Sequence, residues 1–203
     1  KLPTKMLPPD SKLPSLNADT WFEPWATSLR MSDLGYSNQN QSKINISLNS
    51  VDEYVRDLSN AICTPEPAYE ELGVKVDGHY RQLNANLLQI ENEYYSALRP
   101  KRTAASGEKP IHALMGRGVE YIEVRCLDLD PFSAVGITAP QVDFLDLFLL
   151  DCLLQDSPRI GDDECSRLDN NFKDVVARGR GRDLALQLGN RSVNAGETAL
   201  ELL

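Results

Sequence analysis

The apolar residues of this 203-residue chain recur at helical spacing in three segments. In the first, apolar side chains fall on one face from Val51 to Ile62, and the repeat stops at Thr64. Ser50 and Glu53 stand at its start in the spacing of a capping box, where each side chain bonds the backbone of the other residue. The pattern therefore predicts an amphipathic helix between these limits.

Two further helices are expected in the second half of the chain. Thr138 and Gln141 form another capping box and open a run to about Gln155 that is apolar nearly all round, which predicts a buried helix. Residues 162–177 carry a narrower apolar stripe, and Gly179 follows it, as glycine often follows a helix. This segment therefore predicts an amphipathic helix.

Strands are expected between these helices. Asp77-Gly78 separates two short runs that can alternate, which predicts a β-hairpin. The next segment, residues 82–95, fits a strand or a short helix, and we prefer a strand. In that strand Glu91 and Glu93 would share one face, where two carboxylates need a positive partner.

The stretch GVEYIEVRCLDLDPF, Gly118 to Phe132, contains the last predicted strand. Before it, residues 111–115 leave room for at most one helical turn. Alternation in the strand places Glu123 and Arg125 on one face. An ion pair on a solvated sheet explains this pair without any function. The alternative is a polar, sheet-lined cavity that binds charged ligands.

Two segments lack a regular pattern. Residues 1–24 hold five of the twelve prolines and show no periodicity, which predicts an extended or loop segment. The polar stretch that follows contains Arg30 and Tyr36, with Gly35 supplying backbone freedom. This stretch fits either a binding loop or an ordinary turn.

Charge and composition exclude several classes of protein. The formal net charge of −9 argues against nucleic-acid binding as the main activity, because phosphate contacts need clustered Lys and Arg. The only basic run, Arg178, Arg180 and Arg182, is expected to lie in a solvated loop. No apolar run approaches the roughly eighteen residues of a membrane span. The four cysteines show no C-x-x-C spacing and fit free thiols in a reducing cytoplasm.

Familiar catalytic motifs are absent from the sequence. It has no glycine-rich phosphate loop, no G-x-S-x-G, and no H-E-x-x-H around His79 or His112. Carboxylates for Mg²⁺ together with arginines for anionic oxygens would nevertheless suit phosphoryl transfer. Any nucleotide would then be held by metal ions and side chains.

Three ordered segments closely resemble the bacterial glutamate–cysteine ligase family of the gamma-proteobacterial type: ATSLRMSDLGY (26–36), LQIENEYYSALRPKR (88–102) and GVEYIEVRCLDLDPFS (118–133). The likeness extends over nearly the whole chain. It implies an α+β fold similar to glutamine synthetase, with helices packed outside a curved, mainly antiparallel sheet. Residues 1–203 would then be the central to C-terminal portion of the catalytic domain, a fragment lacking both ends.

The resemblance also implies an activity. Enzymes of this family use ATP and Mg²⁺ or Mn²⁺ to join the γ-carboxylate of glutamate to cysteine through an acyl phosphate, the first step of glutathione synthesis. The expected partners are glutamate, cysteine and ATP, with no nucleic acid and no membrane. A cytoplasmic enzyme that is monomeric at full length is expected.

Position by position, the resemblance assigns roles to the strand pair. Glu123 matches a metal-binding glutamate, and Arg125 matches an arginine that contacts the transferring phosphoryl group. A guanidinium offers a planar fork of donors to such an anion, which Lys cannot do. Both groups would need one face of one strand.

Other matches lie on the substrate side. Arg30 matches an arginine at the carboxylates of the amino-acid substrates, and Tyr36 and Tyr95 match tyrosines of the cysteine pocket. Asn92 is placed near the substrate, and Arg102 near the nucleotide.

Two alternatives remain open: a non-catalytic amino-acid or nucleotide-binding module of the same fold, and another amide-forming or phosphagen-type enzyme. Because family enzymes are much longer and use metal ligands from outside this segment, we expect the isolated chain to be inactive.

Overall fold

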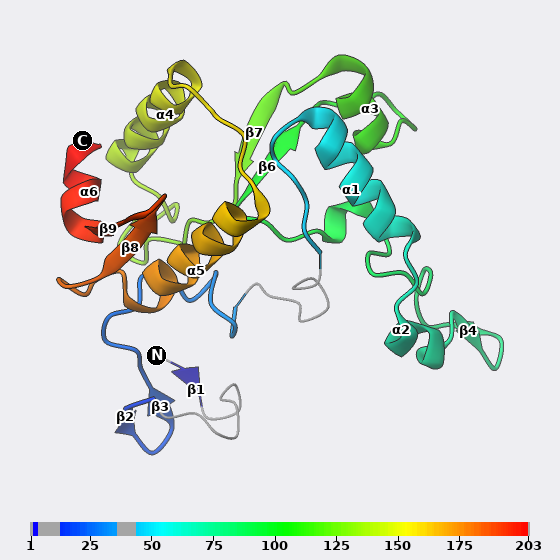
Figure 1. The fold of residues 1–203 in the computed structure, drawn as a ribbon. Coiled ribbons are helices and arrows are strands. Elements are labelled where there is room, and N and C mark those ends of the chain that lie inside the picture. The colour runs from blue at the N-terminus through cyan, green and yellow to red at the C-terminus, as the bar shows by residue number, and fades with distance from the viewer. Residues whose placement is uncertain (1, 4–12, 36–43, 203) are drawn as a thin grey trace. The chain divides into compact units, whose positions relative to one another are not determined.

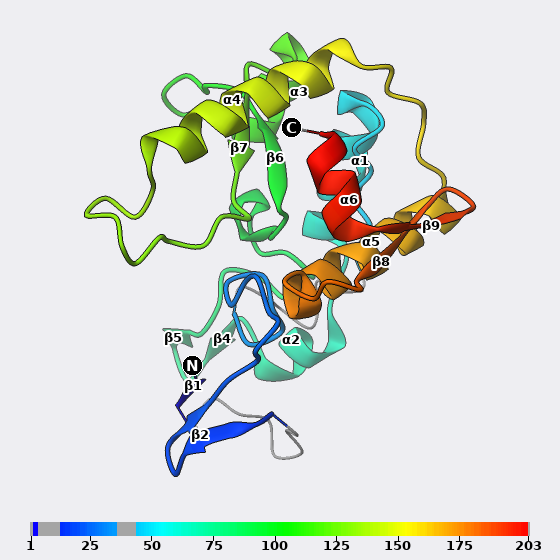
Figure 2. The same ribbon diagram turned by 90° about the vertical axis from the view of Figure 1, so that its left-hand side faces the viewer.

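The computed structural model describes residues 2–3, 13–35 and 44–202, which form helices and small antiparallel sheets (Figure 1 and Figure 2). All strand pairings among these residues are antiparallel. The chain divides into two compact units. The central unit is Tyr36–Cys126, and the two-segment unit combines Lys1–Gly35 with Leu127–Leu203. The observed class is therefore a mixture of helices and antiparallel strands, α+β.

The central unit contains α1 (Val51–Cys63), α2 (Pro67–Leu72), β4 (Lys75–Val76), β5 (His79–Tyr80), η3 (Glu91–Glu93), β6 (Leu98–Lys101), α3 (Pro110–Arg117) and β7 (Tyr121–Val124). The two-segment unit contains β1 (Leu2–Pro3), β2 (Ser15–Asn17), β3 (Thr20–Trp21), α4 (Ala139–Leu154), α5 (Asp162–Arg178), β8 (Ala185–Leu188), β9 (Arg191–Asn194) and α6 (Ala195–Glu201).

The core of the central unit forms where α1 packs beside α3 (Figure 1). The buried residues of α1, Tyr54, Val55, Leu58 and Ala61, follow the i, i+1, i+4, i+7 pattern of one helix face. They meet Leu88, which is fully buried, and two residues of α3. The cluster comprises Ile46, Tyr54, Val55, Leu58, Ala61, Leu88, Ile111 and Leu114.

Two local predictions in this unit are confirmed. α1 begins after Ser50, whose Oγ accepts a hydrogen bond from the Glu53 N–H at 3.1 Å, and it ends just before Thr64. β4 and β5 form the predicted hairpin. Its turn places Asp77 at φ 52° and Gly78 at φ 82°, a left-handed pair that favours Asp-Gly.

The predicted strand over residues 82–95 is wrong. This segment contains the single 3₁₀ turn η3 and one isolated β-bridge, between Asn86 and Pro65, and its backbone is bonded to the end of α1. The Leu87 N–H donates to the Thr64 carbonyl at 2.8 Å, and the Leu88 N–H donates to the Ala61 carbonyl at 3.2 Å. The segment therefore satisfies the free carbonyls of a helix end and is not available to a sheet.

η3 also separates the two carboxylates that were expected to crowd together. Glu93 Oε2 accepts a hydrogen bond from the Gln89 N–H at 2.6 Å, whereas Glu91 Oε2 accepts one from the Ile111 N–H at 2.9 Å. The second bond places a carboxylate at the start of α3, where it stabilises a helix. Together with the burial of Ile111 and Leu114, it explains why α3 has two turns and not the single turn predicted.

The start of the chain has more structure than predicted. β1, β2 and β3 form a three-stranded sheet in the order β1-β3-β2, so parts of the segment expected to be extended or loop are paired as short strands. Pro3 lies in β1, at the edge of this sheet, where the missing N–H of proline is tolerated. Residues 4–12 lie outside the described part.

α4 begins as predicted, because the Thr138 N–H donates to Gln141 Oε1 at 2.8 Å. Its predicted burial is wrong for the part of the chain described, since no residue of α4 is buried. Phe144 and Phe148 stack on each other with ring centroids 5.8 Å apart. An all-round apolar helix is buried only where other elements cover several of its sides, and the described residues do not do so.

α5 confirms the third helix and ends one residue beyond the predicted limit, directly before Gly179. Arg178 belongs to this helix and contacts Asp174 Oδ1 at 2.7 Å, whereas Arg180 and Arg182 are exposed in the following loop. The expected solvated loop thus begins after Arg178.

The sequence analysis missed α2, the hairpin of β8 and β9, and α6. The hairpin lies along α5 (Figure 2). Its turn contains Gly189 at φ 57° followed by Asn190, a pair that is a recognised hairpin signal. This element was therefore visible in the sequence, although it was overlooked.

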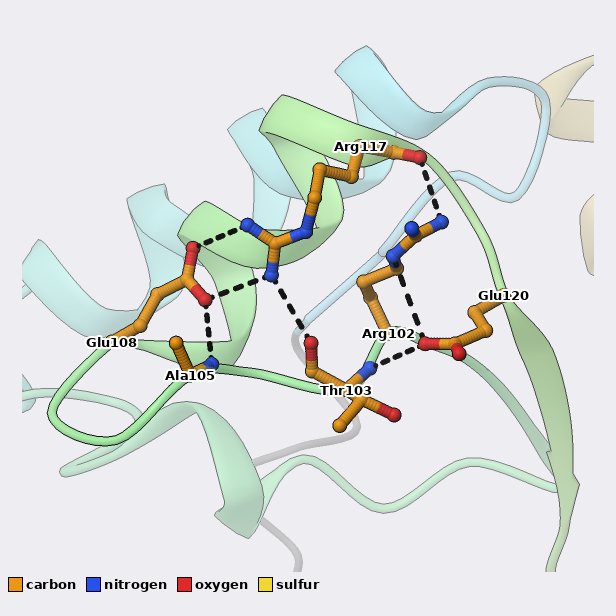
Figure 3. A network of polar contacts seen from close by, with 6 residues as sticks. All are labelled: Arg102, Thr103, Ala105, Glu108, Arg117 and Glu120. Atoms are coloured by element: carbon orange, nitrogen blue, oxygen red, sulfur yellow. Dashed lines mark hydrogen bonds and ion pairs between the residues drawn. The ribbon is translucent and has the colours of Figure 1, made fainter.

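The loop between β6 and α3 is held by a polar network (Figure 3). Arg117 Nη1 and Nη2 donate to the two oxygens of Glu108 at 2.9 and 2.8 Å. The Thr103 N–H donates to Glu120 Oε2 at 2.9 Å, and Arg102 Nη1 donates to the Arg117 carbonyl at 2.9 Å. The loop is therefore tied both to the end of α3 and to the start of β7.

This network lowers the pKa of the Glu108 carboxyl group. The hydrogen bonds from Arg117, followed by that from the Ala105 N–H, lower the pKa of Glu108 from 4.5 to about 2. A lowered folded-state pKa stabilises the fold above the unfolded pKa, and this stabilisation is lost as the pH falls from 4.5 towards 2.

We expect Ser50→Ala to lower the free energy of unfolding by about 1 kcal/mol, because the N-cap acceptor of α1 is lost. Urea unfolding followed by circular dichroism measures this difference. Ser106→Ala, in an exposed turn, is the matched control and should change stability little. Equal unfolding midpoints for the two variants would contradict the capping role.

We expect Glu108→Gln to flatten the loss of stability between pH 4.5 and 2, because the variant lacks the carboxylate that Arg117 stabilises. Unfolding midpoints measured across this pH range, for the unchanged chain and the variant, test the expectation. Glu71→Gln, at an exposed site on α2, is the control. If the unfolding midpoint of Glu108→Gln falls with pH in parallel with that of the unchanged chain, the network is not the source of the pH dependence of stability.

Candidate functional site

The candidate site lies on the ribbon formed by β6 and β7. The register places Arg99 directly opposite Glu123 and Lys101 opposite Tyr121. Beyond the strand, the Arg125 N–H donates to the Ala97 carbonyl at 2.8 Å and continues the ladder. Because side chains alternate along both strands, the charged residues at these positions share one face.

The same face brings several charges to one carboxylate. Arg125 Nε lies 3.6 Å from Glu123 Oε1, and Lys101 Nζ lies 3.6 Å from Glu123 Oε2. The predicted proximity of Glu123 and Arg125 is therefore present in the fold. Arg99 lies opposite Glu123 in the register, so three cationic side chains share this face with one carboxylate, which leaves a surplus of positive charge there.

Burial makes this surplus costly. Desolvation is the main cause that lowers the pKa of Lys101, the charge of Arg99 adds to it, and Glu123 opposes both. Arg99 itself is only 5% exposed. Cations that are buried together without matching carboxylates are unfavourable until an anion joins them.

Arg99 is held from the side of α1 and η3. Its Nη2 donates to the Glu91 carbonyl at 3.2 Å. Burial raises the pKa of Tyr54, and the neighbouring Arg99 guanidinium opposes that rise. Among the described residues, the buried atoms Arg99 Nε and Glu123 Oε2 have no hydrogen-bond partner. These two buried polar atoms are therefore unsatisfied among the described residues.

Three other predicted residues lie near this ribbon in the central unit. Asn92, in η3, and Arg102, directly after β6, border a small cavity of about 20 Å³ beside Arg99. Asn92 also borders an open groove of about 430 Å³ between the end of α1 and the start of α3. The Arg102 guanidinium takes part in the network of Figure 3. Tyr95 follows η3 and is 36% exposed.

The remaining two predicted residues are Arg30 and Tyr36. Tyr36 lies outside the described residues. Arg30 belongs to the two-segment unit, where residues 28–35 form consecutive tight turns. The Arg30 N–H donates to Asp128 Oδ2 at 3.3 Å. The structure therefore brings Glu123 and Arg125 together, and it places Arg30 in a separately held loop.

Sequence reasoning missed two residues of the face and one of the loop. Arg99 and Lys101 were not assigned to the site, although alternation in LRPK places both on one side of a strand. Asp128 was not singled out. No local pattern marks it, because its bonds reach residues about a hundred positions away.

Within the described ranges, no cluster of three or more metal-ligating side chains occurs, and no helix has the length and apolar character needed to cross a membrane. The four cysteines are all described, and each is a free thiol. Any metal ion would therefore receive only part of its ligands from these residues.

Comparison with known proteins gives consistent matches. The model of the family described as glutamate-cysteine ligase matches residues 5–175. A glutamate–cysteine ligase of Hahella chejuensis is 58% identical over 177 residues, covering 87% of this chain and 34% of the relative. One of Alcanivorax borkumensis is 54% identical over 187 residues, covering 90% of this chain and 36% of the relative.

A solved structure is also similar. The crystal structure of glutamate–cysteine ligase from Francisella tularensis in complex with AMP superposes with a TM-score of 0.87 at 40% identity. The match covers 94% of this chain and 38% of that one. The chain thus spans about a third of the length of the curated relatives it matches. Since the family model covers most of the chain, the protein belongs to the glutamate–cysteine ligase family.

Proposed function

We propose that this chain is the central to C-terminal portion of the catalytic domain of an ATP-dependent glutamate–cysteine ligase. The reaction would join the γ-carboxylate of glutamate to the amino group of cysteine, giving γ-glutamylcysteine, ADP and phosphate. The observation that carries the proposal is the charged face of β6 and β7, which three cationic side chains share with Glu123. The family match supports it.

The proposed chemistry has two steps. An oxygen of the glutamate γ-carboxylate attacks the terminal phosphorus of ATP, so that an acyl phosphate forms and ADP leaves. The cysteine nitrogen then attacks the acyl carbon, releases phosphate and loses a proton. Both steps move negative charge onto phosphoryl oxygens, which preorganised cations stabilise without further reorganisation.

The residues of the ribbon would divide this work. Arg125 would direct its planar fork at the transferring phosphoryl group, and the buried Arg99 and Lys101 would add positive charge to the same face. The cost of assembling these cations would be offset when the nucleotide binds. The F. tularensis enzyme was solved in complex with AMP, which supports nucleotide binding by an enzyme of this family.

Glu123 fits a role as a magnesium ligand. Its buried Oε2 has no hydrogen-bond partner among the described residues, and a carboxylate oxygen is a hard donor of the kind that Mg²⁺ or Mn²⁺ prefers. One protein carboxylate combined with phosphate oxygens is a common way to hold Mg²⁺. When bound, such an ion would neutralise charge on the phosphates. Further ligands would come from outside the described residues.

The substrate-side roles follow the family pattern. Arg30 would bind a carboxylate of an amino-acid substrate, Tyr36 and Tyr95 would line the cysteine pocket, and Asn92 would lie near the substrate. Arg102 would approach the nucleotide, although its guanidinium already braces the loop after β6. We further infer a curved, glutamine-synthetase-like sheet that includes β6 and β7, a cytoplasmic location and a monomeric complete enzyme.

The direct test is a chimera in which this chain replaces the matching segment of the H. chejuensis ligase. We expect the purified chimera to release phosphate only when ATP, glutamate and cysteine are all present, and to form γ-glutamylcysteine detectable by mass spectrometry. The isolated chain should show no turnover. A folded chimera that binds nucleotide without product formation would instead support a non-catalytic binding module.

In the chimera, we expect Arg125→Lys to lower kcat about 100-fold with smaller changes in KM, because the bidentate contact is made to the transferring group. Steady-state kinetics with each substrate varied in turn measures the change in kcat separately from the changes in KM. Arg81→Lys, an exposed site of the same unit, is the matched control. An unchanged kcat for Arg125→Lys would refute the role of Arg125.

A further inference from the structure

The side chain of Asp128 holds the loop that carries Arg30. Asp128 Oδ2 accepts hydrogen bonds from the Leu29 N–H at 2.9 Å and the Arg30 N–H at 3.3 Å. Asp128 Oδ1 accepts one from the Ser28 hydroxyl, whose Oγ in turn accepts from the Met31 N–H at 3.0 Å. One carboxylate therefore fixes, directly or through Ser28, the backbone N–H groups of three successive residues.

The same loop is closed from its other end. The Gly35 N–H donates to the Ser32 carbonyl at 2.9 Å, which folds the chain back on residues 29 and 30. A Cβ at Gly35 would lie 2.1 Å from the Leu29 carbonyl oxygen and 2.4 Å from that of Arg30. Only glycine fits this close approach, so the backbone of Arg30 is confined between Gly35 and Asp128.

The loop is also anchored to α5. The Thr27 N–H donates to the Val176 carbonyl at 2.9 Å, and the Thr27 hydroxyl donates to the Val175 carbonyl at 2.6 Å. The Arg180 N–H donates to the Trp25 carbonyl at 3.0 Å. The carbonyls at the end of the helix thus receive their donors from the loop. The start of the loop is fixed by these bonds, so Asp128 acts specifically on the turn that contains Arg30.

We propose that Asp128 is a positioning residue for recognition of an amino-acid substrate, and that it acts by holding the backbone of Arg30 in the orientation that meets the substrate carboxylate. The inference rests on the proposed function, in which Arg30 binds that carboxylate. A side chain whose backbone is already ordered loses less conformational entropy on binding. Without Asp128, this ordering would have to occur when the substrate binds.

Asp128→Asn tests the proposal in the chimera. An amide presents one acceptor oxygen, so the variant cannot accept both from Ser28 and from the backbone N–H groups. Asp130→Asn is the matched control, because among the described residues the Asp130 side chain accepts only from its own turn, from the Phe132 N–H at 2.9 Å. The two changes are chemically identical and lie two residues apart.

We expect Asp128→Asn to raise the KM for one amino-acid substrate about tenfold, with the KM for ATP within about twofold of the unchanged chimera. The affected substrate should be the one whose KM rises most in Arg30→Ala. In the double variant, Asp128→Asn should add little to Arg30→Ala, because its effect passes through Arg30. Asp130→Asn should leave all three KM values nearly unchanged.

Other outcomes would overturn the proposal. A merely structural role of Asp128 would lower kcat or the amount of folded enzyme and shift the three KM values together. If Asp128→Asn does not fold, Ser28→Ala, which removes only the hydroxyl bridge, decides by the same split in KM. A chimera that folds but forms no γ-glutamylcysteine would contradict both the proposed function and this inference. An active chimera in which Asp128→Asn does not raise the KM of one amino-acid substrate selectively would contradict this inference alone.

Discussion

The antiparallel pairing of β6 with β7 is the interaction on which the candidate site depends. Its register sets Arg99 opposite Glu123 and keeps Lys101 and Arg125 on the same face. A slip of one residue would turn one strand's charged side chains to the opposite face. The network around Glu120 and Arg117 supports this register, because it ties the residues after β6 to those before β7.

The unfavourable free energy of burying several cations on this face would contribute to its binding of an anion. Arg99 is buried beside Tyr54 and close to Lys101, and burial together with like charge lowers the pKa of Lys101. A single carboxylate, Glu123, offsets these charges only in part. An anion that enters such a site meets cations whose desolvation has already occurred during folding, so the electrostatic gain on binding is larger than at a hydrated surface.

Local signals in the sequence were sufficient where local bonds decide the structure. The cap at Ser50, the Asp77-Gly78 turn and the glycine after α5 all act within a few residues, and each was predicted correctly. Residues 82–95 were mispredicted as a strand because their backbone bonds go to the end of α1. The exposed helix α4 is a second case in which local pattern was insufficient. Apolar residues on nearly all sides indicate that a helix is to be buried, but they do not identify the residues that bury it.

The ribbon of β6 and β7 and the turn around Arg30 differ in the same way. Glu123 and Arg125 could be placed on one face from alternation alone, because a strand fixes side-chain direction residue by residue. The turn around Arg30 could not, because its shape comes from Asp128, about a hundred positions away, and from the close approach of Gly35 to two backbone carbonyls. Once these contacts have formed, the backbone of the turn has little conformational freedom left. In the proposed roles, Arg30 would then meet a ligand without an ordering step, as Arg125 would on its strand.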